Sequence, residues 1–269
     1  MTAASPQLPP TRPMYRIPMP HLAAFCMDLL LGRRRSFTRD GETVMRANRR
    51  HPRRVEGLGH VVTDRTCIVV MNHYSRDGLR PYHCAFAVSA AMATVRPGQP
   101  EVRWVFTSEY RGRRIGPVPI PLWLVRWAFR RVAVVYDFIV LARREELVMG
   151  RAAALRQIAK LLAAAPIGLT PEGLLGSGVL VQPPPGSGAF LASIAGHSVP
   201  LQPVGIWEED DGTLFIRFGE PFLLDVPAGV PRAERDRAAT EQVMVAIGRL
   251  LPPAYRGAYA DAIAGAQRP

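Results

Sequence analysis

Two short polar segments follow apolar runs and carry the residues that could do chemistry. The first covers residues 72–78, Asn-His-Tyr-Ser-Arg-Asp-Gly, and comes directly after an apolar run that ends at Met71. His73 and Asp77 are four positions apart, and on a helical turn that spacing puts both side chains on one face. A carboxylate beside an imidazole fixes its tautomer and stabilises the imidazolium that forms when the ring takes a proton. The pair could therefore deprotonate an alcohol, although a histidine and an aspartate in such a loop can also be structural.

The second polar segment, residues 169–178, contains Thr-Pro-Glu-Gly and again follows an apolar run. Glu172 could cap a turn or bind backbone amides, or it could orient a substrate or a basic side chain. A third segment, Pro-Pro-Gly-Ser-Gly at 184–188, puts flexible backbone before an expected helix. The first N–H groups of a helix can bind an anion, and an ordinary turn is the alternative interpretation.

The elements that must position these residues follow from apolar patterning. The β-branched run at 67–71 predicts a buried strand, so His73 is expected at the carboxyl end of a strand, where open α/β sheets bind ligands. Further strands are predicted at 102–107, 132–135, 166–170, 199–206 and 214–218, and helices at 81–94, 119–131, 143–165 and 233–251. Strands that alternate with helices predict one α/β domain, a mostly parallel mixed sheet flanked by helices.

The ends of the chain differ from this central region. We expect a disordered tail at 1–14, an N-terminal amphipathic helical segment at 15–48, the α/β domain at 49–255 and a C-terminal tail at 256–269. Within the N-terminal segment, residues 18–35 predict a helix that ends in three arginines. This is either an ordinary helix whose C-terminal dipole favours basic residues, or a surface helix whose arginines reach anionic lipid headgroups.

The composition of the chain limits which kinds of binding partner can be expected. The formal net charge is +12, which attracts anionic lipid, nucleic acid or acidic protein by the same screened Coulomb force. No nucleic-acid-binding motif is visible and aromatic residues are not interleaved with the arginines, so no specific nucleic acid is expected. The cysteines, Cys26, Cys67 and Cys84, match no zinc template. Neither a signal-peptide pattern nor an apolar run long enough to span a bilayer is present, which predicts a cytoplasmic protein lying on the inner face of the cell membrane.

Taken in order, the segments resemble those of the glycerolipid acyltransferase family, the lysophosphatidate and lysophospholipid acyltransferases, over about residues 50–225. The similar segments are Arg54–Gly57, Asn72–Ser75, Pro171–Gly173, Gly186–Ala192, Val199–Val204 and Phe218–Pro221. The resemblance implies a glycerolphosphate-acyltransferase-like fold. It also implies transfer of a fatty acyl group from acyl-CoA or acyl carrier protein to a lysophospholipid-like hydroxyl, without a metal or another cofactor.

In that mechanism His73 would be the general base and Asp77 would orient it, while backbone N–H groups near Gly173 or Gly186 would stabilise the oxyanion. The family has four residues between its histidine and aspartate, whereas this sequence has three, and one position on a helix turns a side chain by about 100°. The arginines with which the family contacts the acceptor phosphate are also absent from their expected places. The residues predicted to bind substrate are Asn72, Ser75, Arg76, Arg80, Glu172 and Gly173, with the two arginines as substitutes for the missing pair. A catalytically degenerate relative that binds lipid or an acyl carrier is the alternative.

Overall fold

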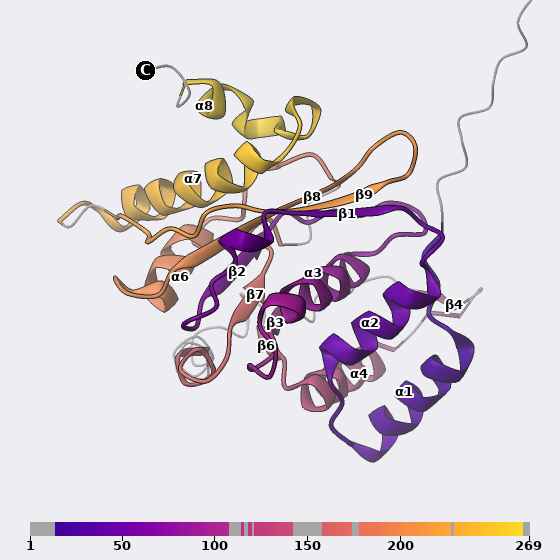
Figure 1. Cartoon of the computed structure of the whole chain (residues 1–269). Helices are drawn as coiled ribbons and strands as arrows, with labels where there is room; N and C mark the ends of the chain where they lie inside the picture. The colour runs from indigo at the N-terminus through magenta and orange to yellow at the C-terminus, as the bar shows by residue number, and fades with distance from the viewer. Residues whose placement is uncertain are drawn as a thin grey trace, which may run out of the picture.

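A seven-stranded sheet lies at the centre of the computed structural model, which describes residues 14–107, 114–115, 118–119, 121–141, 158–173, 178–226 and 229–265 (Figure 1). The strand order is β1-β9-β8-β2-β7-β3-β6. The strands are β1 (Arg53–Glu56), β2 (Ile68–Met71), β3 (Arg103–Thr107), β6 (Ile139–Leu141), β7 (Ile167–Leu169), β8 (Leu201–Glu208) and β9 (Leu214–Phe218). All neighbours in this sheet pair in parallel except β8 and β9, so the predicted mostly parallel mixed sheet is confirmed. A separate two-stranded pairing joins β4 (Arg114–Ile115) and β5 (Val118–Pro119).

Strand β2 occupies the middle of the sheet. All four of its residues, Ile-Val-Val-Met, are buried, as expected for a β-branched strand covered on both faces. It pairs in parallel with β7, where Val70 lies opposite Leu169, and with β8. Parallel neighbours end at the same edge of a sheet, so the polar segments after β2 and β7 meet there.

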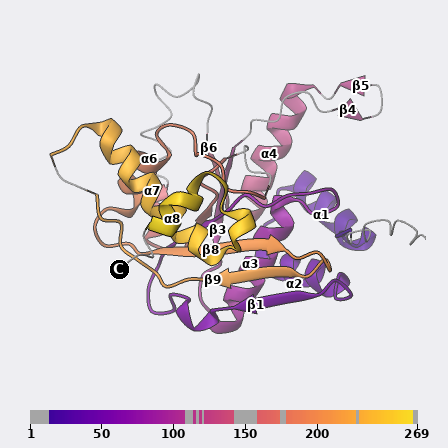
Figure 2. The same cartoon turned by 90° about the horizontal axis from the view of Figure 1, so that it is seen from above.

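Helices cover both faces of the sheet. The helices are α1 (Met19–Leu31), α2 (Phe37–Ala47), α3 (Pro81–Val95), α4 (Leu122–Tyr136), α6 (Ser187–Ala195), α7 (Arg232–Leu250) and α8 (Ala260–Gly265), with short 3₁₀ turns η1 (Leu58–His60), η3 (Pro253–Tyr255) and η4 (Gly257–Tyr259). Helices α1 to α4 lie on one side of the sheet, whereas α7 and α8 lie on the other (Figures 1 and 2). No helix in the described ranges has both the length and the apolar character needed to cross a bilayer.

The strand predicted at 132–135 is wrong, because these residues continue helix α4. Val132 and Tyr136, four positions apart, both face the same cavity, so the apolar run has helical rather than strand periodicity. Asp137, with a left-handed φ of 56°, ends the helix, and β6 follows it. The other strands and the helices at 81–94 and 233–251 are found within two residues of their predicted bounds.

The single helix predicted at 18–35 is also wrong. Helix α1 ends at Leu31, where Gly32 has a φ of 68°, and α2 begins after Ser36, whose side chain accepts a hydrogen bond from the N–H of Arg39 at 3.0 Å. The segment predicted at 15–48 therefore contains two helices, and the second packs against α3. Of the helix predicted at 143–165, only residues 158–165 lie within the described residues, and 158–162 are helical.

The C-terminal residues pack on the domain as far as the structure describes them. The stretch predicted as a tail at 256–269 contains η4 and α8, and the side chains of Tyr259 and Ile263 are buried. A Cβ atom on Gly248 of α7 would lie 2.4 Å from Cδ1 of Ile263, so a larger residue at 248 would require the Ile263 side chain to shift. Residues up to Gly265 thus belong to the folded unit.

Candidate active site

The side chain of Asn72 makes the last hydrogen bonds between the end of β2 and strand β8. Its Nδ2 donates to the carbonyl oxygen of Ile206 at 2.7 Å, and its Oδ1 accepts the N–H of Ile206 at 2.8 Å. The amide thus replaces the next peptide of β2, and the main chain can leave the sheet while β8 keeps its partners. Asn72 was predicted to bind substrate, but it is buried and both polar atoms are used on β8.

His73 follows at the point where the chain leaves the sheet. Its backbone N–H donates to Oε2 of Glu172 at 2.7 Å, and the N–H of Val181 donates to Oε1 of the same carboxylate at 2.9 Å. Glu172 is 1% exposed, and burial raises the pKa of its carboxyl group although the two N–H donors act in the opposite direction. Of the alternatives for Glu172, the geometry therefore matches the binding of backbone amides, which joins the two polar segments.

The segment after His73 is a tight turn rather than a helix. Arg76 and Leu79 exchange backbone hydrogen bonds at 3.0 and 3.1 Å, with Asp77 and Gly78 between them. Gly78 has a φ of 82°, as the third residue of a type II turn requires. The expectation that His73 and Asp77 share a helical face is therefore wrong, and the Asp77 side chain is exposed.

Arg76 is held in a buried ion pair. Its guanidinium makes a two-point contact with the carboxylate of Glu208, with one of the two distances at 2.5 Å, and Glu208 at the end of β8 is 0% exposed. The hydroxyl group of Tyr74 donates to the same carboxylate at 3.4 Å. Burial disfavours the charge of Arg76, but the bonds to Glu208 outweigh it and raise the pKa of the guanidinium. Arg76 thus ties the turn to β8, which is a different use from the predicted substrate contact.

The remaining predicted residues lie around the same turn. Ser75 is half-buried, and Arg80 is exposed at the start of α3. The N–H of Arg80 donates to Nδ1 of His83 at 3.0 Å, as in a capping box, so Arg80 begins the helix with its backbone.

A large apolar cavity begins at His73. Its volume is about 690 Å³, within the range of sites that hold small molecules. Apolar side chains from α1, α2, α3, α4, α6 and β3 form much of its wall, and Gly173 borders it as His73 does. The lining residues that pattern reasoning missed include Phe25, Phe86, Phe129, Phe190 and Tyr136, because they come from separate helices whose packing brings them together.

The two predicted oxyanion donors are engaged inside the protein. The N–H of Gly186 donates to Oδ2 of Asp236 at 2.7 Å, and the N–H of Gly173 donates to the carbonyl oxygen of Thr170 at 3.1 Å. Asp236 also accepts the N–H of Ala189 at 2.8 Å, so a carboxylate from α7 already occupies the N-terminus of α6. The expectation that Gly186 offers its N–H to a ligand is therefore wrong.

Arg232, at the start of α7, is the one arginine or lysine among the cavity-lining residues that the structure describes. The sequence offered no signal for this position beyond one arginine among many. Over the same described ranges, no group of three His, Cys, Asp or Glu side chains is arranged to hold a metal ion.

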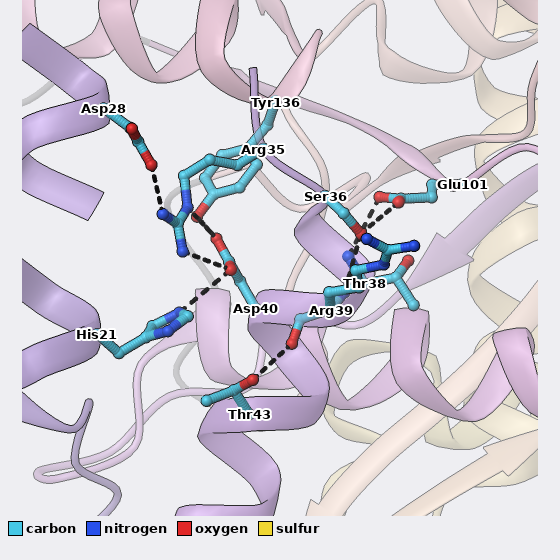
Figure 3. Close-up of polar contacts among 10 residues, drawn as sticks. All are labelled: His21, Asp28, Arg35, Ser36, Thr38, Arg39, Asp40, Thr43, Glu101 and Tyr136. Carbon is cyan, nitrogen blue, oxygen red and sulfur yellow. Dashed lines mark hydrogen bonds and ion pairs between the residues drawn. The ribbon is translucent and has the colours of Figure 1, made fainter. Parts of the chain in front are cut away.

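A second polar cluster borders the cavity on the side of α1 (Figure 3). Arg35 donates from Nε and Nη2 to Asp40 at 2.7 Å each, and from Nη1 to Asp28 at 2.5 Å. Asp40 also accepts the hydroxyl group of Tyr136 at 2.6 Å, and Nε2 of His21 lies 3.2 Å from it. Both His21 and Tyr136 line the cavity.

Comparisons with known proteins give a likeness to solved structures. No protein-family description matches the chain, and no curated protein matches it. The solved structure of the 1-acyl-sn-glycerophosphate (LPA) acyltransferase PlsC from Thermotoga maritima is similar at 20% sequence identity and a TM-score of 0.45. The alignment covers 85% of this chain and 88% of that chain.

Proposed function

We propose that this protein is an acyltransferase that moves a fatty acyl group from a thioester to the hydroxyl group of a lysophospholipid-like acceptor. The observation that carries the proposal is the position of His73. It follows the central strand, is half-buried, and borders an apolar cavity of about 690 Å³. An imidazole can take a proton from a hydroxyl group, and an apolar cavity favours a fatty chain because burial removes the chain from water.

The reaction is a direct transfer. The imidazole of His73 takes the proton of the acceptor hydroxyl while the hydroxyl oxygen forms a bond to the thioester carbonyl carbon. The carbon–sulfur bond then breaks, and the leaving thiolate takes the proton back from the imidazolium. The fixed backbone of His73, bonded to Glu172, supports this role because the ring starts from a defined position. We assign no orienting role to Asp77 and leave the oxyanion donors unassigned.

The proposed acyl donor is acyl-CoA or acyl carrier protein. Both carriers are anionic, and the chain has a formal net charge of +12. Arg232 borders the cavity and gives it a permanent positive charge that can contact a phosphate group of the donor or of the acceptor.

We further propose that the protein works at an anionic membrane surface, the inner face of the cell membrane. Large apolar side chains are exposed on α1 and α4, among them Met19 at 73% and Trp123 at 69%. Arg33 and Arg34, directly after α1, are exposed as well. Apolar groups flanked by arginines favour a lipid surface with negative headgroups.

The test is acyl transfer from labelled acyl-CoA to a panel of lysolipids carried in anionic or in neutral vesicles. We expect His73→Ala to lower kcat by about 10²–10⁴-fold, the usual contribution of a general base, and the wild type to be faster on anionic vesicles. The matched control is His197→Ala, because His197 is exposed and lies away from the cavity lining. Transfer by His73→Ala at the wild-type rate would remove His73 as the base.

A second candidate is a degenerate relative that binds acyl chains or acyl carriers without transferring them. It is favoured by the exposed position of Asp77 in a turn and by the pairing of Arg76 with Glu208. In the same assay this protein would bind a fatty acid and give no product with any acceptor. Product formation that depends on His73 would exclude it.

A further inference from the structure

Helix α1 covers one side of the cavity without joining the core. Leu22 and Phe25 line the cavity, yet none of the residues 19–31 is buried. The ring of Phe25 stacks on that of Tyr136 with centroids 5.8 Å apart, and α1 packs beside α4. The helix is therefore a wall that touches the domain along one side only.

Two polar contacts join the side chains of α1 to the rest of the described chain. His21 meets Asp40 of α2, and Asp28 meets Arg35, whose guanidinium also binds Asp40 (Figure 3). Arg35 thus bridges one carboxylate on α1 and one on α2. Asp28 and His21 are 21% and 17% exposed, so water can replace their contacts when these break, whereas Asp40, 7% exposed, stays buried with Arg35.

The chain is fixed on both sides of α1. Before the helix, Arg16 and Asn48 exchange two hydrogen bonds of 3.0 and 2.8 Å between the main chain of one and the side chain of the other. After it, the N–H of Arg35 donates to the carbonyl oxygen of Val135 at 2.9 Å. Gly32, with a φ of 68°, lies between α1 and this second fixed point. A helix between two fixed points can move as a unit while the rest of the fold stays in place.

We propose that α1 is a lid on the cavity, that the contacts of Asp28 and His21 are its latch, and that an acyl chain enters when the latch opens. The proposal rests on the proposed function only in assigning the cavity to an acyl chain. Opening breaks only the contacts of Asp28 and His21, since Arg35 keeps its two-point contact with Asp40, and the exposed apolar side chains of α1 gain from contact with lipid. An open lid would therefore be favoured where acyl chains are found.

The test is stopped-flow uptake and release of a dansyl-labelled long-chain fatty acid by the whole protein. Asp28→Asn removes one latch contact, so we expect both association and dissociation to be faster by about fivefold, with the dissociation constant almost unchanged. A change in the cavity wall alone would instead alter the affinity. Amide hydrogen exchange in residues 19–31 should accelerate by a similar factor, because a detached helix of this length is unstable, while β2 stays protected.

The matched control is Asp64→Asn, which removes the same charge from an exposed side chain outside the cavity lining. Asp64→Asn should leave the rate of probe uptake and the amide hydrogen exchange of residues 19–31 unchanged. Equal rates of probe uptake and release in wild type and Asp28→Asn would overturn the lid. Weaker binding of the probe without faster uptake and release would also overturn it. Faster probe uptake and release by Asp28→Asn, in a protein that transfers no acyl group, would support the lid but contradict the proposed transferase function. No uptake by the wild type would overturn both.

Discussion

The two sides of the cavity are held by different kinds of contact. Beside His73, polar side chains bind the backbone: Asn72 replaces a peptide of the sheet, and Glu172 accepts two main-chain N–H groups. The ion pair on this side, between Arg76 and Glu208, has a carboxylate that is 0% exposed. Beside α1, charged side chains of Asp28, Arg35 and Asp40 bind one another. The first kind of contact depends on the fold itself, whereas the second can break and form again with little change elsewhere.

This difference separates a fixed site from a movable wall. A base must be held within a fraction of an ångström to be effective, and buried bonds to the backbone provide that precision. The α1 wall can move aside when only the contacts of Asp28 and His21 break, and the Asp28 carboxylate, 21% exposed, is within reach of water. The comparison predicts that equally conservative substitutions will have unequal effects on the two sides.

The largest effect is expected from Arg76→Met. It leaves the Glu208 carboxylate, which is 0% exposed, without its guanidinium, and an unpaired buried charge costs about 3–5 kcal/mol. Asp28→Asn on the other side should lower the free energy of unfolding by only about 1 kcal/mol, because Arg35 keeps Asp40. Urea denaturation followed by circular dichroism measures both values.

Arg65→Met controls for the loss of an arginine, since its side chain is 62% exposed, and it should change the free energy of unfolding by about 0.5 kcal/mol or less. The double variant Arg76→Met/Glu208→Gln should recover part of the loss, because it removes the second charge as well. Equal losses for Arg76→Met and Asp28→Asn would contradict the distinction between the two sides.

The same contrast explains what could be predicted from the sequence. The strand β2 and the meeting of its polar segment with that of β7 follow from local patterns, because a β-branched run and parallel pairing are enough to place them. The partner of Arg76 could not be predicted, since Glu208 lies 132 positions away and only folding brings it near. The shared helical face predicted for His73 and Asp77 was wrong for a local reason, because a turn with Gly78 as its third residue replaces the assumed helix.

The N-terminal region shows another feature that could not be predicted from the sequence. Its apolar content and arginines predicted helix, yet nothing local showed that α1 and α2 would both contribute to the wall of the cavity. The lining of the cavity comes from α1, α2, α3, α4, α6 and β3, and each contributes side chains that look like ordinary core residues in the sequence. A site made of long-range packing therefore has no sequence motif.

The next-largest effect is on the pH dependence of the free energy of unfolding, and it involves His83, the buried residue that caps α3 beside the turn. Burial first, and then the charges of Arg80 and Arg76, lower the pKa of His83 to about 4 from an ordinary 6.5. Below pH 6.5 the unfolded chain takes up a proton that the folded chain excludes, so the free energy of unfolding falls as the pH falls towards 4. The loss is about 1.4 kcal/mol per pH unit, or about 3 kcal/mol over the window, and above pH 6.5 it disappears.

His83→Gln is the variant for this test, because glutamine at this position can still accept the N–H of Arg80 but does not titrate in the window. Urea midpoints measured from pH 7.5 to pH 4 should fall less steeply for the variant than for the wild type. His60→Gln, at an exposed position, is the control and should follow the wild type. Parallel curves for His83→Gln and the wild type would show that His83 does not take part in the acid sensitivity of this side.

The smallest of the predicted effects on stability beside His73 is expected from Glu172→Gln, which should also affect function. Glutamine keeps the volume but offers one accepting oxygen where the carboxylate offers two, so the N–H of His73 or of Val181 loses its partner, at about 1–3 kcal/mol. Part of this loss is offset, because the raised pKa of Glu172 means that burial already opposes its charge. A small displacement of His73 should lower kcat by about tenfold to a hundredfold with a smaller change in KM. Because the α1 side is untouched, uptake of the fatty-acid probe should stay at the wild-type rate, and a variant that lost uptake and kcat together would join the two sides that the structure separates.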